Sequence, residues 1–460
     1  MPRSPSRPLT YDLRQQQSGP ATWTNWAGNQ SCSPRDLIRP AGRAELSELV
    51  ATATQAGRKV AVAGSGHSFT GAALSDDLLL DVSSIAGVIE VDLPSGLVKV
   101  GGGTVLADLN RALDSLGLAM ANLGDIDSQT IAGSISTGTH GTGAARPNLP
   151  AQIAAIDLVT ADGEVLELAE SPDPDTGPGD DGSSDLLRAA RVAIGSLGVI
   201  SAVTLKTVPA FNLHRVDEPM PLDRVLADFD ELTAANEHFE FFIFPYTDTA
   251  LTICRNSTVR PPAPRGRFER YLGDVVIENA LGDLALRAIG KVPSVIPRTA
   301  RFSSRFMSQA EQIDVSHRCF ANYRTIRFNE MEYAVPREFG AEALGRVLDL
   351  IREERMPLAM PIECRVVPAD DNLISPVSGR DSTYIAIHQH AGQEWQPYFR
   401  EIERIFDSYG GRPHWGKHHF QTAETLAPRY PEWDRFAKVR DRLDPTRTFT
   451  NEYVRTVLGD

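Results

Sequence analysis

The chain has 460 residues, of which 42% are hydrophobic and 23% are charged, and its formal net charge is −14. This length exceeds the usual size of one hydrophobic core, so we expect a globular protein with at least two domains. The acidic balance and the lack of clustered lysine and arginine argue against a nucleic-acid-binding surface, but not against a small anionic cofactor held by backbone N–H groups.

The N-terminal segment 1–22 contains three arginines with no apolar run after them, so it is predicted to be a disordered tail and not a secretory signal. No uninterrupted apolar stretch of about 18 residues occurs, so no integral membrane segment is predicted, while peripheral attachment stays open. The cysteines are few and scattered, which is typical of reduced thiols in a cytoplasmic protein. They are Cys32, Cys254, Cys319 and Cys364.

The first part of the chain is predicted to alternate short strands with helices. Helices are predicted at Arg43–Ala56, Val105–Leu116 and Leu186–Ile194. Strands are predicted at Lys59–Val62, Leu78–Val82, Val88–Asp92, Leu97–Val100, Ile153–Thr160, Glu164–Ala169 and Val199–Val208. The glycine-rich segment Ile131–Gly143 is predicted to be neither helix nor strand, and Ser171–Ser184 is predicted to be a mobile surface loop.

The pattern changes from Phe211 to about Phe406, where longer helices alternate with strands, as in a second, α+β domain. The helices predicted there include Leu222–Glu237 and Ala341–Glu353, and the strands include Phe239–Phe244, Glu363–Val367 and Thr383–His388. The last fifty or so residues are rich in aromatic side chains, and we expect them to pack back onto the first domain.

A strand runs directly into a glycine turn in VAVAGSGHSF, residues 60–69. A nicotinamide-binding Rossmann turn fits poorly, because Phe69 stands where glycine or alanine is required and Thr70–Asp77 is too short for the helix. A second glycine cluster, Gly138–Gly143, follows about seventy residues later. Two such loops can enclose an extended diphosphate with backbone N–H donors.

Three segments together resemble the vanillyl-alcohol-oxidase type of flavoprotein, and within it the aldonolactone oxidase branch, with alditol oxidase as a near cousin. They are VAVAGSGHSFTGAALSDDLLLDVSSI, NLGDIDSQTIAGSISTGTHGTG and PHWGKHHF, and the similarity spans Trp23 to Leu458. The resemblance implies a two-domain α+β fold. An FAD-binding (PCMH-type) domain would cover 23–209, an α+β cap domain for the substrate 210–406, and a C-terminal return 407–460.

The resemblance also implies that FAD is the cofactor and that His67 carries it covalently. The alternative is that His67 caps the turn or bonds the diphosphate. The cofactor-binding residues implied are Gly64, Ser65, Gly66, His67, Ser68, Gly124, Asp125, Ser128, Gly133, Thr137, Gly138, His140, Gly141 and Val199. No metal ligand is expected.

Glu363 and Arg365 are two residues apart on a predicted strand, so both side chains should project from one face, and His388 and His390 share this spacing. The resemblance places Glu363, Arg365, His388 and Lys417 around the reacting edge of the flavin. Without the flavin motifs, these residues would read as an ordinary cross-strand ion pair with buried histidines. His390 departs from the alditol oxidase pattern.

The function that the resemblance implies is oxidation of a small sugar lactone, with L-gulono-1,4-lactone as the first candidate, to a 2-keto lactone that tautomerises to ascorbate or an analogue. The electron acceptor would be oxygen, a quinone or a cytochrome. Gly124 lies where, by the resemblance, the absence of a side chain leaves a path for dioxygen.

Three alternatives stay open. The first is an alditol oxidase of the same fold, which oxidises a polyol. The second is a metal-dependent hydrolase that uses His388 with His390, or a set drawn from His414, His418 and His419. The third is a flavoprotein that has lost catalysis and acts as a binding module.

Overall fold

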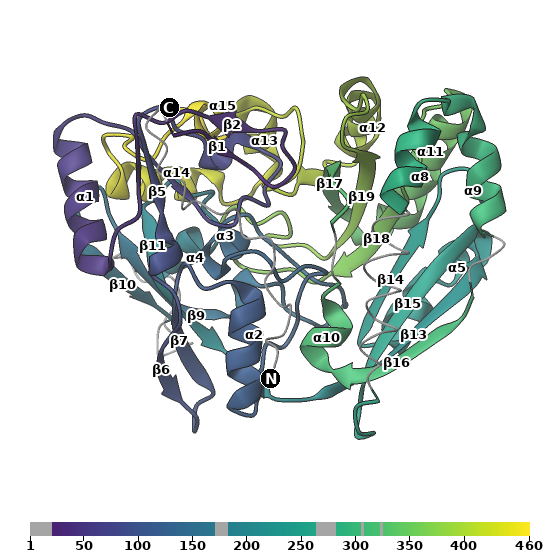
Figure 1. Ribbon diagram of the computed structural model, residues 1–460, viewed down its shortest axis with the longest axis horizontal. Coiled ribbons are helices and arrows are strands. Elements are labelled where there is room, and N and C mark those ends of the chain that lie inside the picture. Colours follow the sequence, from purple (N-terminus) through teal and green to yellow (C-terminus); the bar gives the residue numbers. More distant parts are fainter. Residues whose placement is uncertain (1–20, 171–182, 264–281, 305–307, 323–324) are drawn as a thin grey trace.

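The computed structural model describes residues 21–170, 183–263, 282–304, 308–322 and 325–460, and Figure 1 shows two halves, each built around β-sheets. The predicted tail, apart from residues 21 and 22, and most of the predicted loop, residues 171–182, lie outside the described residues. Within the described parts of the chain, no helix combines the length and apolar character needed to cross a membrane.

The N-terminal half contains a five-stranded antiparallel sheet in the order β10-β9-β11-β7-β6 and a three-stranded parallel sheet in the order β3-β5-β4. Its strands are β1 (Trp23–Thr24), β2 (Ser31–Cys32), β3 (Asp36–Ile38), β4 (Val60–Ala63), β5 (Leu78–Asp81), β6 (Val88–Asp92), β7 (Leu97–Gly101), β8 (Leu118–Ala119), β9 (Ile153–Val159), β10 (Val165–Ala169), β11 (Val199–Lys206) and β12 (Val208–Pro209). Its α-helices are α1 (Arg43–Gln55), α2 (Leu106–Ser115), α3 (Ile131–Ser136) and α4 (Ser183–Arg191).

The predicted strands and helices of this half are confirmed, apart from shifts of one or a few residues at their ends. Between β4 and β5 the described chain forms only a single 3₁₀ turn, Gly71–Ala73. The sequence predicts that Thr70–Asp77 is too short for the helix of a Rossmann turn, and the structure has no α-helix between these two strands.

The prediction that Ile131–Gly143 contains no helix is wrong, because α3 occupies its first six residues. Thr130 caps this helix by accepting a hydrogen bond from Gly133 N, and Ile131 and Ile135 are fully buried one turn apart. The cap and the burial of these two side chains outweigh the cost of one glycine inside the helix.

The second half, the cap, is an eight-stranded sheet in the order β16-β13-β15-β14-β18-β19-β17-β20. Its strands are β13 (Asn212–Pro221), β14 (His238–Ile243), β15 (Thr249–Thr258), β16 (Ala310–Val315), β17 (Phe328–Pro336), β18 (Ile362–Val367), β19 (Ser382–His390) and β20 (Arg412–Pro413). Its helices are α5 (Leu222–Ala227), α6 (Phe229–Ala235), α8 (Gly282–Gly290), α9 (Ile296–Ser304), α10 (Ser316–Phe320), α11 (Gly340–Glu353) and α12 (Gln396–Ser408).

One helix predicted at Leu222–Glu237 is in fact two, α5 and α6, because the backbone of Asp228 leaves the helical conformation between them. Both helices, with α11 and α12, cover one face of the cap sheet. Val225, Phe229, Leu344 and Phe399 contribute to the apolar core that they form there.

The C-terminal segment links the two halves. Its strand β20 pairs with β17 of the cap, and the helices α13 (Ala423–Leu426), α14 (Trp433–Leu443) and α15 (Glu452–Leu458) then pack on the N-terminal half (Figure 1). Trp415, between these parts, is fully buried, stacks on Tyr430 with ring centroids 5.6 Å apart, and donates a hydrogen bond from Nε1 to Ile374 O at 2.7 Å.

Replacing Trp415 with alanine should lower the free energy of unfolding by about 3–5 kcal/mol, because it removes a large buried ring and leaves Ile374 O without its donor. Urea unfolding followed by circular dichroism measures the loss. Trp433→Ala, at a half-buried ring on α14, is the matched control and should cost clearly less. Equal losses in the two variants would contradict the assigned role of Trp415.

Candidate functional site

The face of the cap sheet opposite its apolar core is polar, although it is buried. Since successive residues of a strand point to opposite faces, β18 turns Cys364 toward the core and Glu363 and Arg365 toward the other side, as their spacing predicts. The strand register extends this face, because Glu240 pairs with Arg365 and Glu330 with His388. Buried charges of this kind must be paired with one another.

Arg365 joins the two halves. Its Nη2 donates to Glu363 on the same strand and to Asp125 from the N-terminal half, and its Nε lies 3.1 Å from Glu240 Oε2. Burial alone would lower the pKa of Arg365, but Asp125, Glu363 and Glu240 raise it well above its ordinary value. Arg255 Nη2, 2.9 Å from Glu240 Oε1, supplies a second cation.

The Nε–H of Arg365 is a buried donor that makes no hydrogen bond among the described residues, although Glu240 Oε2 lies 3.1 Å from Nε. An unpaired buried donor costs about 1–3 kcal/mol unless a ligand satisfies it. The Nε–H of Arg365 is therefore a candidate donor to a bound ligand.

Lys417 lies on the same polar face. Its Nζ donates to Glu330, and His388 Nε2 lies 3.5 Å from the other oxygen of that carboxylate. Burial opposes ionisation of Glu330, yet Lys417 and His388 hold its pKa well below the usual range. Hydrogen bonds between β17 and the C-terminal segment fix this arrangement, since His418 N donates to Glu330 O at 2.8 Å.

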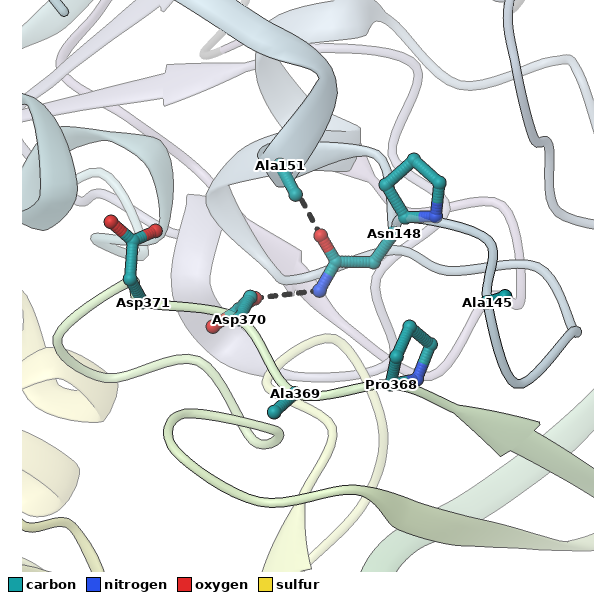
Figure 2. Close-up of a pocket in the computed structure, with 8 residues that line it drawn as sticks. Ala145, Asn148, Ala151, Pro368, Ala369, Asp370 and Asp371 are labelled. Atoms are coloured by element: carbon teal, nitrogen blue, oxygen red, sulfur yellow. Dashed lines mark hydrogen bonds between the residues drawn. The ribbon is translucent and has the colours of Figure 1, made fainter. Parts of the chain in front are cut away.

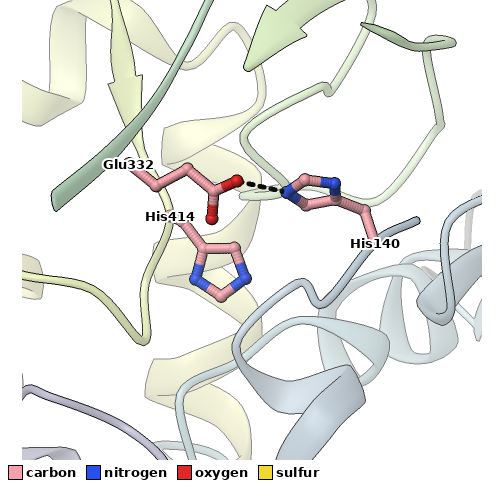
Figure 3. A group of neighbouring side chains, drawn as sticks. All are labelled: His140, Glu332 and His414. Atoms are coloured by element: carbon pink, nitrogen blue, oxygen red, sulfur yellow. Dashed lines mark ion pairs between the residues drawn. The ribbon is translucent and has the colours of Figure 1, made fainter. Parts of the chain in front are cut away.

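Figure 3 shows a second buried group, in which His140 of the N-terminal half faces Glu332 of β17 beside His414. His140 Nε2 lies 3.2 Å from Glu332 Oε1, and the His140 ring stacks on Tyr384 with centroids 3.7 Å apart. Burial opposes ionisation of Glu332, but His140 lowers its pKa to about 2. Gly416 N donates to His414 Nδ1 at 3.0 Å.

Three loops that are distant in the sequence meet beside this polar face. They are residues 64–68 after β4, residues 122–141 around α3, and residues 414–418 after β20. A Cβ atom on Gly64 would lie 2.4 Å from Thr130 Oγ1, and one on Gly416 would lie 3.5 Å from Thr137 Cβ. Phe69 N also donates to Gly416 O at 2.8 Å, so both glycine loops predicted from the motifs lie against the Lys417 loop.

The loop 64–68 suits an anionic group. Gly64 and Ser65 are exposed, and no backbone N–H group from Gly64 to Ser68 has an acceptor in the described parts of the chain. Gly66 has a φ of +70°, a conformation that glycine adopts readily. Free N–H groups on a turn beside the start of α3 fit the diphosphate of the predicted FAD.

His67 lies at the tip of this loop and is half-buried. Its ring lies 5.4 Å from that of Trp26, and burial lowers its pKa to about 4, with a smaller effect from the nearby Lys417 ammonium. The imidazole of His67 is therefore neutral at pH 7, and its nitrogen lone pair is available as a nucleophile.

The other predicted cofactor residues divide into two groups. Gly124, Gly138 and Gly141 allow neighbouring segments of the chain to approach the backbone closely. A Cβ atom on Gly124 would lie 3.1 Å from His140 O, and one on Gly138 would lie 3.3 Å from Pro376 Cδ. A Cβ atom on Gly141 would lie 2.2 Å from Leu123 O. Gly133 and Thr137 form α3 and its end, where Thr137 Oγ1 donates to Gly133 O at 3.2 Å.

Ser128 is half-buried in the segment that leads to α3. Val199, in contrast, is 1% exposed and packs in an apolar core with Leu80 and Val159, so its side chain does not line the glycine loops. His390 lies on the same face of β19 as His388, and its Nε2 is 2.9 Å from Asp283 Oδ1 of α8.

Sequence reasoning did not single out Glu240, Glu330 and Glu332, and it named His414 only as a hypothetical metal ligand. The segment FNEMEYAV carried a usable signal, because its two glutamates alternate with apolar residues, as in a strand with one polar face. Their partners, His140 and Lys417, lie far away in the sequence, so no local pattern could reveal these pairs.

The histidines of the hydrolase alternative do not gather around one point. His418 Nε2 lies 3.0 Å from Asn329 Oδ1, and His419 Nε2 lies 2.8 Å from Tyr453 OH. Among the described residues, two groups bring three possible ligand atoms together, His140–Glu332–His414 and Asp125–Glu240–Glu363, and ion pairs occupy both. The geometry does not favour a hydrolase.

A surface depression of about 480 Å³ lies elsewhere, where residues 145–151 meet the segment after β18 (Figure 2). Asn148 bridges the two segments: its Nδ2 donates to Asp370 Oδ2 at 2.6 Å, and its Oδ1 accepts from Ala151 N at 2.9 Å. The polar groups at this depression serve the contact between the two halves, and none of the predicted site residues lines it.

Comparisons with known proteins agree with the geometry of the site. A model of the FAD binding domain matches residues 34–169, and a model of the D-arabinono-1,4-lactone oxidase family matches residues 203–457, more than half of the chain. The chain belongs to the D-arabinono-1,4-lactone oxidase family. The predicted family and FAD as the cofactor are thereby confirmed.

Relatives of this protein match nearly the whole chain. An L-gulono-1,4-lactone dehydrogenase of Mycobacterium tuberculosis is 48% identical and covers 95% of this chain and 99% of its own. An alditol oxidase of Streptomyces is 30% identical over 95% of this chain and 98% of its own. The cholesterol oxidase of Brevibacterium sterolicum has a similar fold, with a TM-score of 0.76 at 16% identity over 95% of this chain and 96% of its own, which confirms the predicted fold class.

The buried histidines make stability sensitive to acid. Burial lowers the pKa of His238 and His418 to about 4 and that of His414 and His419 to about 3. Between those values and about pH 6.5, the unfolded chain binds more protons than the folded one, so the free energy of unfolding should fall as the pH drops.

The expected slope is about 1.4 kcal/mol per pH unit for each full proton of difference. Urea unfolding between about pH 7.5 and pH 5 measures this slope. Glu332 also lowers the free energy of unfolding in acid. Its pKa is about 2 in the folded protein, so the stability that the ionised carboxylate contributes is lost as the pH falls from about 4.5 toward 2. A free energy of unfolding that is constant or rises from pH 7.5 to pH 5 would contradict these assignments.

Proposed function

We propose that this protein oxidises a sugar 1,4-lactone, with L-gulono-1,4-lactone as the first candidate, to a 2-keto lactone that tautomerises to ascorbate or an analogue. The observation that carries the proposal is the meeting of Arg365, Glu363, His388 and Lys417 on one buried face, beside the glycine loop of His67. The 48% identity to an L-gulono-1,4-lactone dehydrogenase, against 30% to an alditol oxidase, favours a lactone over a polyol.

We assign FAD to the N-terminal half, 23–209, where residues 64–68 and 138–141 would hold its diphosphate and His67 would bind it covalently. The cap, 210–406, would bind the lactone, and the C-terminal segment, 407–460, would close the site. When bound, FAD supplies the acceptor for the hydride of the reacting carbon–hydrogen bond.

His388 is suited to take the proton of the substrate hydroxyl. Its Nδ1–H donates to Pro361 O at 2.8 Å, so the lone pair of the neutral ring lies on Nε2, which faces the polar side of the sheet. Once Nε2 is protonated, the Glu330 carboxylate 3.5 Å away stabilises the resulting cation.

Arg365 and Lys417 act on the negative charge that develops in the reaction. The Arg365 guanidinium stays charged at any working pH, and its unpaired Nε–H can donate to the substrate oxygen as the proton leaves. Lys417 supplies a second cation next to His67, and Glu363 orients Arg365 and accepts hydrogen bonds from substrate hydroxyls.

The electron acceptor we propose is oxygen, a quinone or a cytochrome, and the proposed location is the cytoplasm. The family resemblance supports oxygen as an acceptor, because it places Gly124, which has no side chain, beside the flavin. The intact set of charged residues argues against a flavoprotein that only binds its ligand.

The direct test is anaerobic mixing of the flavin-loaded protein with L-gulono-1,4-lactone, D-arabinono-1,4-lactone and an alditol such as xylitol. Bleaching of the flavin band near roughly 450 nm by a lactone, and slower bleaching by the alditol, is expected. Faster bleaching by the alditol would replace the proposal with an alditol oxidase, and no bleaching by any of the three would remove both assignments.

His67→Ala should abolish covalent flavin. After acid precipitation, the wild-type pellet should stay yellow, whereas the flavin of the variant should appear in the supernatant. His214→Ala, at a histidine of the edge region of the cap sheet, is the matched control and should keep the yellow pellet. A yellow pellet from His67→Ala would transfer the attachment to another residue.

Lys417→Met should lower turnover by about a hundredfold or more while FAD stays bound, because a preorganised charge acts mainly on the transition state. Lys438→Met is the matched control, since Lys438 is exposed on α14, and it should retain wild-type turnover. Stopped-flow reduction by L-gulono-1,4-lactone and the flavin-to-protein absorbance ratio provide the two readouts. Wild-type turnover in Lys417→Met would remove Lys417 from the site.

A further inference from the structure

Residues 23–30, which we call the N-terminal strap, run from β1 to β2 beside the loop 64–68. Four hydrogen bonds tie the strap to this loop and to the residue after it, and in each the strap donates to a backbone carbonyl. They are Trp26 N to Gly66 O at 2.8 Å, Asn25 Nδ2 to Ser68 O at 2.9 Å, and Asn29 Nδ2 and Gln30 Nε2 to Phe69 O at 3.2 Å each. The strap therefore holds the loop by its carbonyl groups, and among these described residues it uses none of the N–H groups of residues 64–68.

The strap is a fixed structure because Asn25 organises it. Asn25 is 1% exposed, and its Oδ1 accepts hydrogen bonds from Asn29 N and Gln30 N at 3.1 Å each. The loop packs tightly against the strap, since a Cβ atom on Gly66 would lie only 3.2 Å from Trp23 Cζ2. The position of the strap thus sets the position of the loop that carries His67.

The strap also contacts the side chain of His67 through Trp26. The two ring centroids lie 5.4 Å apart, with an angle of 30° between the ring planes. The Trp26 ring is itself held by edge contacts with Phe69 and Phe328, at centroid distances of 6.5 and 5.5 Å. Within the described parts of the chain, neither ring nitrogen of His67 makes a hydrogen bond, so packing on Trp26 restricts the directions in which those nitrogens point.

We propose that Trp26 is a positioning residue for the covalent attachment of FAD. Its ring holds the imidazole of His67 in the orientation from which a ring nitrogen reaches the 8α carbon of the flavin. Such a bond forms only when the lone pair of the nitrogen points at the carbon, and an imidazole without hydrogen bonds must obtain this orientation from packing. The inference rests on the proposed attachment through His67 and names the residue that directs it.

The attachment step joins a ring nitrogen of His67 to the 8α carbon. One C–H bond of the 8α-methyl group and one N–H bond of the imidazole break as the N–C bond forms. The two protons and two electrons released pass to dioxygen, which leaves as hydrogen peroxide, so the attached flavin ends in its oxidised state. Trp26 takes no part in this transfer and acts only on the orientation of His67.

A purely structural role for Trp26 makes a different prediction. If its ring served only to pack against Phe69 and Phe328, its loss would weaken the strap, and FAD binding and FAD attachment would fall together. A positioning role separates the two, because the free N–H groups of residues 64–68 would still bind the diphosphate while His67 points in the wrong direction.

The test uses full-length protein produced under riboflavin limitation, so that part of it lacks flavin, and incubated in air with FAD. Flavin in the acid-precipitated pellet measures attachment over time, and flavin retained after desalting measures total binding. Trp26→Leu keeps an apolar side chain but no flat ring, and it should attach FAD about tenfold or more slowly with unchanged total binding. Trp26→Phe restores a flat ring and should recover most of the rate. Trp433→Leu, at a half-buried ring on α14, is the matched control and should attach FAD as the wild type does.

Attachment at the wild-type rate in Trp26→Leu, equal slowing in Trp26→Phe, or a parallel loss of binding and attachment would overturn the proposal. A wild-type protein without covalent flavin would overturn it together with attachment through His67, whereas bleaching of that flavin by L-gulono-1,4-lactone would leave lactone oxidation in place. Slower attachment in Trp26→Leu, with no bleaching of the wild-type flavin by any of the proposed substrates, would support the role of Trp26 and remove the proposed substrate.

Discussion

Arg365 is 6% exposed, and its guanidinium lies among Asp125, Glu240 and Glu363, which come from three different segments of the chain. Three carboxylates this close together would repel one another strongly in a buried site. Arg365, which contacts all three, and Arg255, which pairs with Glu240, make the arrangement possible. Asp125 belongs to the N-terminal half and the two glutamates to the cap sheet, so the site is complete only when the halves are together. The ion pairs of the candidate site therefore also hold the two halves together.

Two more buried carboxylates on the polar face of the cap sheet are paired with groups from other parts of the chain. Glu330 holds Lys417 from the C-terminal segment, and Glu332 holds His140 from the N-terminal half. Each carboxylate of β17 thereby fixes a group from another part of the chain, while the opposite face of the strand packs in an apolar core. The period of two residues in a strand is what allows one sheet to carry both a core and a charged site.

The sequence was most informative where function requires a special backbone. The glycine turn at 64–68 and the cluster at 138–143 could be recognised because phosphate binding needs free N–H groups and close approach, which only a few residue types permit. The spacing of Glu363 and Arg365 predicted a shared face correctly. Contacts between distant segments, such as that of Glu332 with His140, leave no local pattern and could not be predicted.

The errors in secondary structure have a similar origin. The short helix α3 exists because a threonine cap and two buried isoleucines outweigh a glycine, and tertiary burial of this kind overrides local propensity.

The measurement that tests the central claim most directly is the anaerobic rate of flavin reduction by L-gulono-1,4-lactone in Arg365→Lys. Lysine keeps the positive charge, but it lacks the planar guanidinium group that binds the carboxylates. It also lacks the Nε–H that arginine offers to the substrate. If Arg365 organises the site, the limiting reduction rate should fall by about a hundredfold or more and the lactone should bind more weakly, with FAD still bound. Reduction at the wild-type rate and affinity would contradict the account, because it would separate the charge cluster from the chemistry.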